Sequence, residues 1–427
     1  MINNKTMIHR VIFRYCLLGI AFLLPVYGRL VPPLIAVMVL SWLIEGRFRE
    51  KFRMVRSDRM RMLTLSFGLF YLLYLAGLIC TSNFEYGLFD LQVKFSILIF
   101  PLLLATADEE FFSSSQRRQV LIVYISGCLA GSLLFMGRAF IETVYNHSVN
   151  AFFYGSLSWY FHSSYLSMYY NFAIAAILGH LITLDWKRKI PLCIMEAGLI
   201  LWFIILVFLL SSKAGILTLG GLLLFCTGLL IFKRKNWLGG IIVLIVSTGI
   251  FYTTYRLLPG PFQRMETVGK VIRSDAGKLN QSPESTAERL AIWKVSTEII
   301  RDHYLLGVGT GDVKDALYVK YAEKSMVSAL NKKLNAHCQY LQTFIALGIT
   351  GFLFLVLMLV LPGIQAIRRK DNLYLVFLGI FAFNILVESM FEIQAGVVFY
   401  AFFNAFLFIS MSTTNQGSTD NTEKRES

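Results

Sequence analysis

Long apolar runs, separated by short polar connections, are the feature that most constrains the fold of this chain of 427 residues. An α-helix rises ~1.5 Å per residue, so about 20 apolar residues cross the ~30 Å hydrocarbon core of a bilayer. The runs are continuously apolar and do not alternate, which favours helices over the strands of a membrane barrel. Twelve runs approach spanning length: 11–27, 29–45, 63–81, 92–107, 119–138, 165–184, 190–210, 216–232, 237–254, 338–361, 373–390 and 397–412. The sequence therefore predicts an all-α polytopic membrane protein with about twelve transmembrane helices.

The composition agrees with a membrane protein, because 56% of the residues are hydrophobic and only 15% are charged. Soluble domains carry about a quarter charged residues. The net charge of +14 does not indicate a nucleic-acid partner, since the basic residues form short clusters between the apolar runs. The six cysteines are scattered and form no CxxC pair, which argues against a zinc site and a disulfide framework. No cleavage-site pattern precedes the second run, so we expect the first run to remain as a helix.

The orientation follows from the loops, because every second loop is basic and basic loops of membrane proteins lie in the cytoplasm. The basic loops are 46–62, Arg117-Arg118, Lys187-Arg188-Lys189, Lys233-Arg234-Lys235 and Arg368-Arg369-Lys370. Both termini are then predicted to be cytoplasmic, and the alternate loops to face outward.

One large outward loop, between the ninth and tenth runs, divides the chain. We predict transmembrane helices 1–9 over residues 1–254 and a loop subdomain of two or three short helices over 255–337. Helices 10–12 follow over 338–412. The tail 413–427 is rich in Ser, Thr and Asn, and its composition is typical of a disordered cytoplasmic segment.

Arg289, inside this loop, is the first candidate functional residue. Ser285 with Glu288 three positions later is a capping-box pattern, which predicts that a helix starts there. At helical spacing, Arg289 shares a face with Trp293, Ser296 and Ile300, whereas Lys294, Glu298 and Arg301 lie on the opposite face. An unpaired charge in an apolar face is costly unless an anion meets it. We therefore expect an anionic partner for Arg289.

Two further cations are candidates for binding an anion on the outer side. Lys213 lies in the short turn Ser211–Gly215 between two apolar runs, where an interfacial lysine reaching for water is an equally good interpretation. Arg264 lies in the large loop near the membrane, where it could equally contact lipid headgroups. Both are predicted to contact phosphate.

The candidate bases are histidines at the outward-facing boundary between membrane and water. His337 precedes the tenth run, and an imidazole there could take a proton from a hydroxyl, although a lone histidine at a helix start is more often structural. His162 and Tyr165 lie at the entrance of the sixth run and are possible substrate contacts. With Trp159 and Tyr160 they also fit an aromatic belt.

Other patterns are weak. The segment 307–311 (GVGTG) is suggestive of a phosphate loop, but no strand precedes it and no GK[ST] follows, so a tight turn between surface helices fits better. No HExxH motif and no outward DxD-type carboxylate pair is present in the sequence, so we predict no metal and no cofactor. Glu196 and Glu388 lie in or near apolar runs, where they are compatible with ion coupling in a transporter.

Residues 285–361 resemble the O-antigen ligase/polymerase superfamily of membrane glycosyltransferases. The segment 288–293 (ERLAIW) resembles its Arg-x-x-x-Trp helix, and 304–311 (YLLGVGTG) resembles its P-L-x-G-x-G-x-G turn. The segments 337–342 (HCQYLQ) and 347–351 (LGITG) resemble its H-N-x-Y-L-x … G-x-x-G signature. His162-Ser163-Ser164-Tyr165 resembles its H-P-x-Y element. Outside 160–361, the likeness is limited to hydropathy and topology.

These motifs differ from the family pattern at two places. Cys338 follows the histidine, where the family has Asn, and Ser212-Lys213-Ala214 replaces Ser-Arg-Gly. Lysine keeps the positive charge but lacks the planar fork that grips two phosphate oxygens at once.

The resemblance implies a single inverting transfer of a glycan from undecaprenyl diphosphate to an acceptor hydroxyl, without a metal or cofactor. His337 would then deprotonate the acceptor, and Arg289, with Lys213 and Arg264, would stabilise the departing diphosphate. The implied location is the periplasmic face of a bacterial inner membrane, among membrane lipids and without nucleic acid. An O-antigen ligase acting on a lipid A-core hydroxyl is the leading hypothesis.

Three alternatives remain. A polymerase of the same superfamily would use a second lipid-linked glycan as acceptor and share nearly every motif. A relative that transfers the glycan to protein is a more distant alternative. A flippase or other transporter of polyprenyl-linked glycans would fit the number of runs, but it needs polar groups along a path through the bundle.

Overall fold

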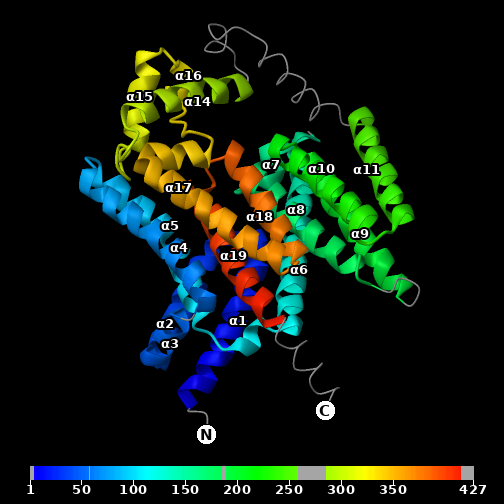
Figure 1. Cartoon of the computed structure of the whole chain (residues 1–427). Coiled ribbons are helices and arrows are strands. Elements are labelled where there is room, and N and C mark those ends of the chain that lie inside the picture. The colour runs from blue at the N-terminus through cyan, green and yellow to red at the C-terminus, as the bar shows by residue number, and fades with distance from the viewer. Residues whose placement is uncertain (1–3, 57, 148, 185–188, 258–284, 415–427) are drawn as a thin grey trace.

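The computed structural model describes residues 4–56, 58–147, 149–184, 189–257 and 285–414. Every regular element among them is a helix (Figure 1). The twelve predicted runs coincide with α1 Asn4–Tyr27, α2 Val31–Glu45, α4 Asp58–Ala76, α5 Phe84–Ala105, α6 Ser114–Asn146, α8 Ser163–Leu181, α9 Ile190–Leu209, α10 Lys213–Gly228, α11 Trp237–Leu257, α17 Gln339–Arg368, α18 Asn372–Val387 and α19 Gln394–Thr414. Short helices connect or flank them: α3 Phe48–Arg56, α7 Tyr154–Ser158, α14 Ser285–Asp302, α15 Val313–Glu323 and α16 Val327–Asn331.

Seven helical elements of the described chain are long and apolar enough to cross a membrane. One of them, Thr6–Glu45, joins α1 and α2 through a single 3-10 turn, and three shorter apolar helices accompany the seven: Thr64–Cys80, Trp237–Gly249 and Asn372–Val387. Large apolar side chains such as Ile194, Leu224 and Ile245 are more than half exposed, as expected where a helix faces lipid. The chain is therefore a polytopic membrane protein, and twelve crossings remain the prediction of the hydropathy pattern.

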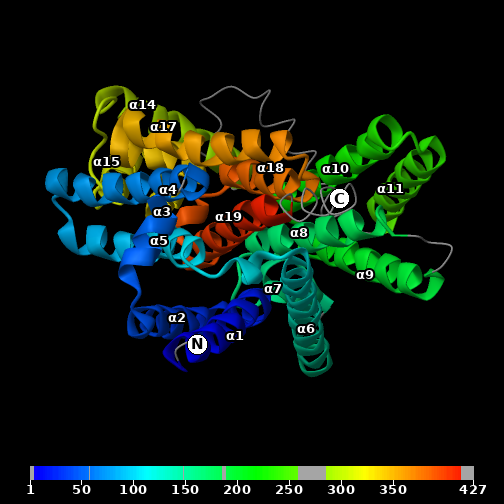
Figure 2. The ribbon, with the colours of Figure 1, turned by 60° about the horizontal axis from the view of Figure 1, so that its bottom comes forward.

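The centre of the bundle is occupied by α19, which runs between the other helices (Figure 2). Of its spanning window, 89% is buried inside the protein. Its aromatic rings pack against aromatic rings of neighbouring helices; Tyr400, for example, stacks on Phe381 of α18 at 4.3 Å between centroids. Such pairs add packing energy beyond the burial of their area. The middle of the described bundle is thus filled by side chains.

The large loop adds a helical layer at one end of the bundle, made by α14, α15 and α16 (Figure 1). The described part of the loop thus holds three helices, whereas the prediction of two or three short helices concerned the whole of 255–337. The rest of the loop, 258–284, lies outside the described residues and includes Arg264. Residues 415–427 of the predicted disordered tail lie outside them as well.

A glycine turn fastens this layer to a kink in α17, where Gly348 has the positive φ of 64°. The backbone N–H groups of Val308 and Gly309 donate to the carbonyl groups of Ile345 and Ala346, at 2.8 and 3.0 Å. A Cβ atom on Gly348 would lie 2.3 Å from the carbonyl oxygen of Leu305, so no larger residue fits there. The segment 307–311 is therefore a packing turn, as the sequence favoured, and its N–H groups are used within the protein.

Three of the basic loops lie together at the other end of the bundle. Nη2 of Arg117 donates to Oδ1 of Asp371 at 2.9 Å, and Nζ of Lys233 donates to Oδ1 of Asn372 at 3.1 Å. The start of α1 and the end of α19 also point toward the end opposite α14–α16 (Figure 1). The alternation of basic loops therefore corresponds to a real separation of the two ends of the bundle.

Candidate functional site

The candidate site lies where four helix ends meet. Arg289 belongs to the first turns of α14, and Lys213 is the first residue of α10. His337 stands just before α17, whose N-cap is Cys338, and Glu388 directly follows the last residue of α18. The first N–H groups and the last C=O groups of a helix have no hydrogen-bond partner within that helix. Helix ends are therefore suitable places for a polar site in an apolar bundle.

Arg289 meets its expected anion, and that anion is Glu388. Nη2 of Arg289 lies 3.0 Å from Oε2 of Glu388, and Nη1 donates to the carbonyl oxygen of Val387 at 2.6 Å. The predicted apolar face is confirmed, because its Ser296 and Ile300 are buried, and Ile292 beside them is fully buried. The Arg289 side chain remains 29% exposed, and its guanidinium carries five N–H donors, more than these two contacts use.

His337 binds the same carboxylate. Its Nδ1 atom lies 3.1 Å from Oε1 of Glu388, and its side chain is 17% exposed. The backbone of His337 has a φ of 46°, and its N–H group donates to Oδ1 of Asn335 at 3.0 Å. A left-handed conformation at a non-glycine residue is uncommon and is maintained here by the surrounding contacts.

Glu388 remains ionised between these two partners. Burial alone would raise its pKa, but the hydrogen bond with His337 and the charges of Arg289 and His337 outweigh burial and lower the pKa to about 2. In the sequence, Glu388 lies near the end of an apolar run, which suggested only ion coupling. Its contacts cross 99 and 51 positions of the chain, and no local pattern reports such distant partners.

Lys213 joins the site from α10. Its Nζ atom donates to the hydroxyl of Thr286 at 2.6 Å, one turn before Arg289 on α14. Ser212 caps α10 by accepting from the N–H group of Gly215 at 3.2 Å. A Cβ atom on Gly215 would lie 2.5 Å from Cβ of Ser167, so glycine allows α10 to approach α8 closely.

His162 and Tyr165 line the neighbouring part of the site from the start of α8. Their rings pack edge to face at 6.1 Å, and the Tyr165 hydroxyl lies 3.5 Å from the carbonyl oxygen of Ser389, next to Glu388. Burial lowers the pKa of His162; the charge of Glu388 opposes this, whereas those of Arg289 and His337 reinforce it. Tyr165 is only 2% exposed, so it is not a belt residue facing lipid, whereas Trp159 is 59% exposed.

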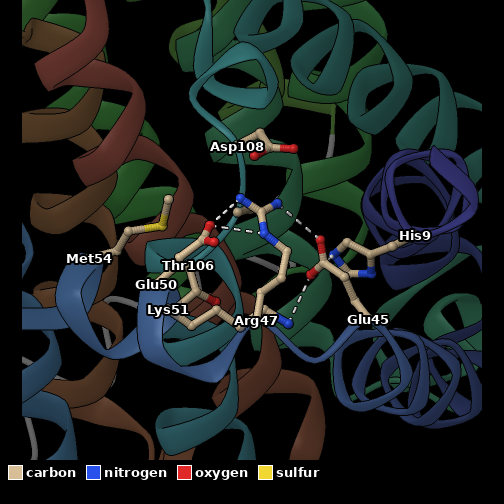
Figure 3. Close-up of a pocket in the computed structure, with 9 residues that line it drawn as sticks. His9, Glu45, Arg47, Glu50, Lys51, Met54, Thr106 and Asp108 are labelled. Atoms are coloured by element: carbon tan, nitrogen blue, oxygen red, sulfur yellow. Dashed lines mark hydrogen bonds and ion pairs between the residues drawn. The ribbon is translucent and has the colours of Figure 1, made fainter. Parts of the chain in front are cut away.

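A second charged cluster lies away from this site, where α1, α2 and α3 meet (Figure 3). Figure 3 shows Lys51 and Arg47 directed toward Glu45, and Nζ of Lys51 lies 2.8 Å from Oε2 of that carboxylate. Nδ1 of His9 lies 2.9 Å from the Ser41 hydroxyl. The space between these side chains is only about 10 Å³, roughly that of one water molecule. The cluster ties three helices together, and part of the basic loop 46–62 is therefore paired.

Glu196, the other carboxylate that lies in or near an apolar run, is also paired. Oε1 of Glu196 lies 2.6 Å from Nδ1 of His180. Both carboxylates that suggested ion coupling thus bind partners within the protein.

The comparison with known families bears directly on this site. Residues 198–356 match the family described as O-Antigen ligase, and no curated protein matches the chain. The matched region contains Lys213, Arg289 and His337, whereas His162 and Glu388 lie outside it. The family comprises membrane ligases and polymerases, and it implies lipid-linked glycans as the general class of substrate. Residues 198–356 are therefore similar to the O-antigen ligase family, as the motifs of this region predicted.

Proposed function

We propose that this protein is an O-antigen ligase-type glycosyltransferase. It moves a glycan from undecaprenyl diphosphate to a hydroxyl of the lipid A-core, in one inverting step that needs neither metal nor cofactor. The observation that carries the proposal is the contact of both His337 and Arg289 with the single carboxylate of Glu388. This contact supports a base and an anion-binding group acting side by side.

Glu388 supports His337 as the base. An ionised carboxylate only accepts hydrogen bonds, so the proton of their contact belongs to Nδ1 of the imidazole. In the neutral ring, Nε2 then has its lone pair free to accept the proton of a sugar hydroxyl. The negative charge of Glu388 stabilises the imidazolium that forms, as the carboxylate does in a serine-protease triad.

Arg289 and Lys213 support the departure of the diphosphate. The leaving group gains negative charge as the bond to the sugar breaks, and preorganised cations lower the free energy of that transition state. Arg289 is held by two contacts before substrate binds, which reduces the reorganisation needed during the reaction.

The proposed step balances as follows. The acceptor oxygen forms a bond to the anomeric carbon, and the bond from that carbon to the phosphate oxygen breaks. The electron pair leaves with undecaprenyl diphosphate, and the acceptor proton passes to Nε2 of His337. Attack from the side opposite the phosphate inverts the anomeric configuration. His162 and Tyr165 would contact the substrate, and Arg264, outside the described residues, would add a third cation.

A polymerase of the same family is the alternative, since it would use the same groups with a second lipid-linked glycan as acceptor. The bundle favours an enzyme over a flippase. A transporter needs a polar path between its two ends, whereas α19 fills the middle of the described bundle with aromatic side chains.

The deciding experiment is the glycan profile of a strain that lacks the gene. Unligated long glycans on undecaprenyl diphosphate are the expected result, and the gene carrying Arg289→Ala or His337→Ala should fail to restore transfer at normal protein level. Single repeat units on the core would instead identify a polymerase. Accumulation of the donor on the cytoplasmic leaflet would contradict both enzymes and identify a flippase.

A further inference from the structure

A large cavity lies at the end of the bundle opposite the candidate site. Its volume is about 670 Å³, and α6, α8, α9, the end of α10 and the α17–α18 turn line it. Helices α8, α10 and α18 run from the candidate site to the cavity. Each has a residue of the candidate site at or next to its first or last turn, and cavity-lining residues at or just beyond its opposite end. The 16 residues of α18 measure about 24 Å, so the two places lie far apart.

The mouth of this cavity carries an excess of positive charge. Four of its ionisable groups form two pairs, Arg117 with Asp371 and His180 with Glu196. The other four, which have no ion pair within the described part of the chain, are Arg118, Arg234, Arg369 and Lys370. All four are exposed. They come from three separate places, the start of α6, the segment after α10 and the α17–α18 turn, which the fold gathers around one opening.

The walls of the cavity are apolar. Leu121 and Ile125 of α6, Ile177 of α8, and Leu192 and Met195 of α9 line it. These helices are part of the membrane bundle, so the apolar walls continue from the charged mouth toward the hydrocarbon region. A small hydrophilic anion would gain nothing from these walls.

We propose that this cavity binds one anionic glycerophospholipid. The four cations hold the phosphate of its headgroup, and its acyl chains lie along the apolar walls between α6, α8 and α9. The volume is within the usual range for ligand sites, of about 300–1,000 Å³. Basic pockets between transmembrane helices on the cytoplasmic side suit phospholipid headgroups. Binding of a phospholipid in this cavity does not depend on the reaction proposed for the candidate site.

The test uses the purified full-length protein in detergent, with dioleoyl phosphatidylglycerol as the probe and dioleoyl phosphatidylcholine as the uncharged comparison. Native mass spectrometry counts the lipids that remain bound. The variant Arg118→Gln/Arg234→Gln/Arg369→Gln should bind phosphatidylglycerol roughly 100-fold more weakly, since each basic residue contributes several-fold to binding of an anionic lipid.

The matched control removes three arginines of α3, as Arg49→Gln/Arg53→Gln/Arg56→Gln. These residues are exposed and belong to another basic loop of the same predicted membrane side, but they do not line the cavity. The control variant should bind phosphatidylglycerol like the wild type. An equal loss in both triple variants would contradict the proposal, because it would indicate general attraction to a positive surface.

Two further measurements probe the apolar part. Ile125→Trp fills the cavity without changing its charge, and it should weaken binding of phosphatidylglycerol about tenfold. Inorganic phosphate at millimolar concentration should fail to displace the lipid. Unchanged lipid binding in a folded Ile125→Trp protein would overturn the proposal, and so would displacement by phosphate alone.

Discussion

Nδ1 of His337 lies 3.1 Å from Oε1 of Glu388, and this carboxylate holds Arg289 with its other oxygen at 3.0 Å. The proposed base and the proposed anion-binding group are therefore positioned by one side chain. That side chain follows α18, whereas its partners come from α14 and the segment before α17. The arrangement makes specific predictions about each of these residues.

Glu388→Gln should lower kcat by about 10²–10⁴-fold while KM changes little. The amide keeps the size of the side chain, but it replaces one of the two acceptor oxygens by an NH2 donor and has no negative charge to stabilise an imidazolium. Transfer from a lipid-linked glycan donor by the purified protein measures the effect. Glu196→Gln is the matched control, since Glu196 is also a buried carboxylate on a histidine, but far from the site. Full activity in Glu388→Gln would remove Glu388 from the mechanism.

The stability of the protein should depend on the charge of Glu388 at low pH. Its pKa is about 2 in the folded protein against an ordinary value of 4.5, so its stabilisation is complete above pH 4.5 and is lost as the pH falls toward 2. This difference corresponds to roughly 3 kcal/mol. Thermal unfolding in detergent should show a gap between wild type and Glu388→Gln that narrows below pH 4.5. A gap that stays constant down to pH 3 would contradict the assignment.

Lys213→Ala should weaken transfer about tenfold or more, because it removes one of two cations beside the proposed diphosphate. Lys213→Arg should retain activity, since arginine keeps the charge and adds a planar fork for phosphate. Both variants are assayed by transfer at several donor concentrations. Lys294→Ala, on the exposed face of α14, is the control and should behave as wild type. If Lys213→Ala also matched the wild type, Lys213 would have only a structural role.

Gly348→Ala should destabilise the protein by several kcal/mol, because alanine disfavours the φ of 64° and its Cβ would clash with Leu305. The clash would separate the glycine turn at 307–311 from α17. Gly379→Ala in α18 is the control, since no atom lies within 4 Å of its added Cβ. Thermal unfolding and membrane protein level measure both variants. Equal stability of the two would show that the kink is not essential.

The predicted orientation can be tested with cysteine labelling. Cys80 is exposed beside a loop predicted to be periplasmic, and Ser115 is exposed at the start of α6, on the predicted cytoplasmic side. In spheroplasts, a membrane-impermeant maleimide should label a chain that retains only Cys80. It should label Ser115→Cys, in a chain without native cysteines, only after the membrane is permeabilised. The reverse pattern would invert the topology and place the candidate site in the cytoplasm.

The positions of most helices can be predicted from the amino-acid sequence. The apolar runs coincide with helices because hydrophobicity is a local property of about 20 residues, and the segment after the capping pattern at Ser285 is helical as predicted. The buried face of α14, with Ile292 and Ser296, follows from helical periodicity alone.

The tertiary structure alone decided which groups meet. The need of Arg289 for an anion was evident in the sequence, but its partner Glu388 lies 99 positions away on another helix. The cations of the opposite cavity likewise come from separate places in the chain. Hydropathy and periodicity describe each helix by itself, whereas the pairing of helix ends depends on how the bundle packs around α19, and that packing is a property of the whole chain.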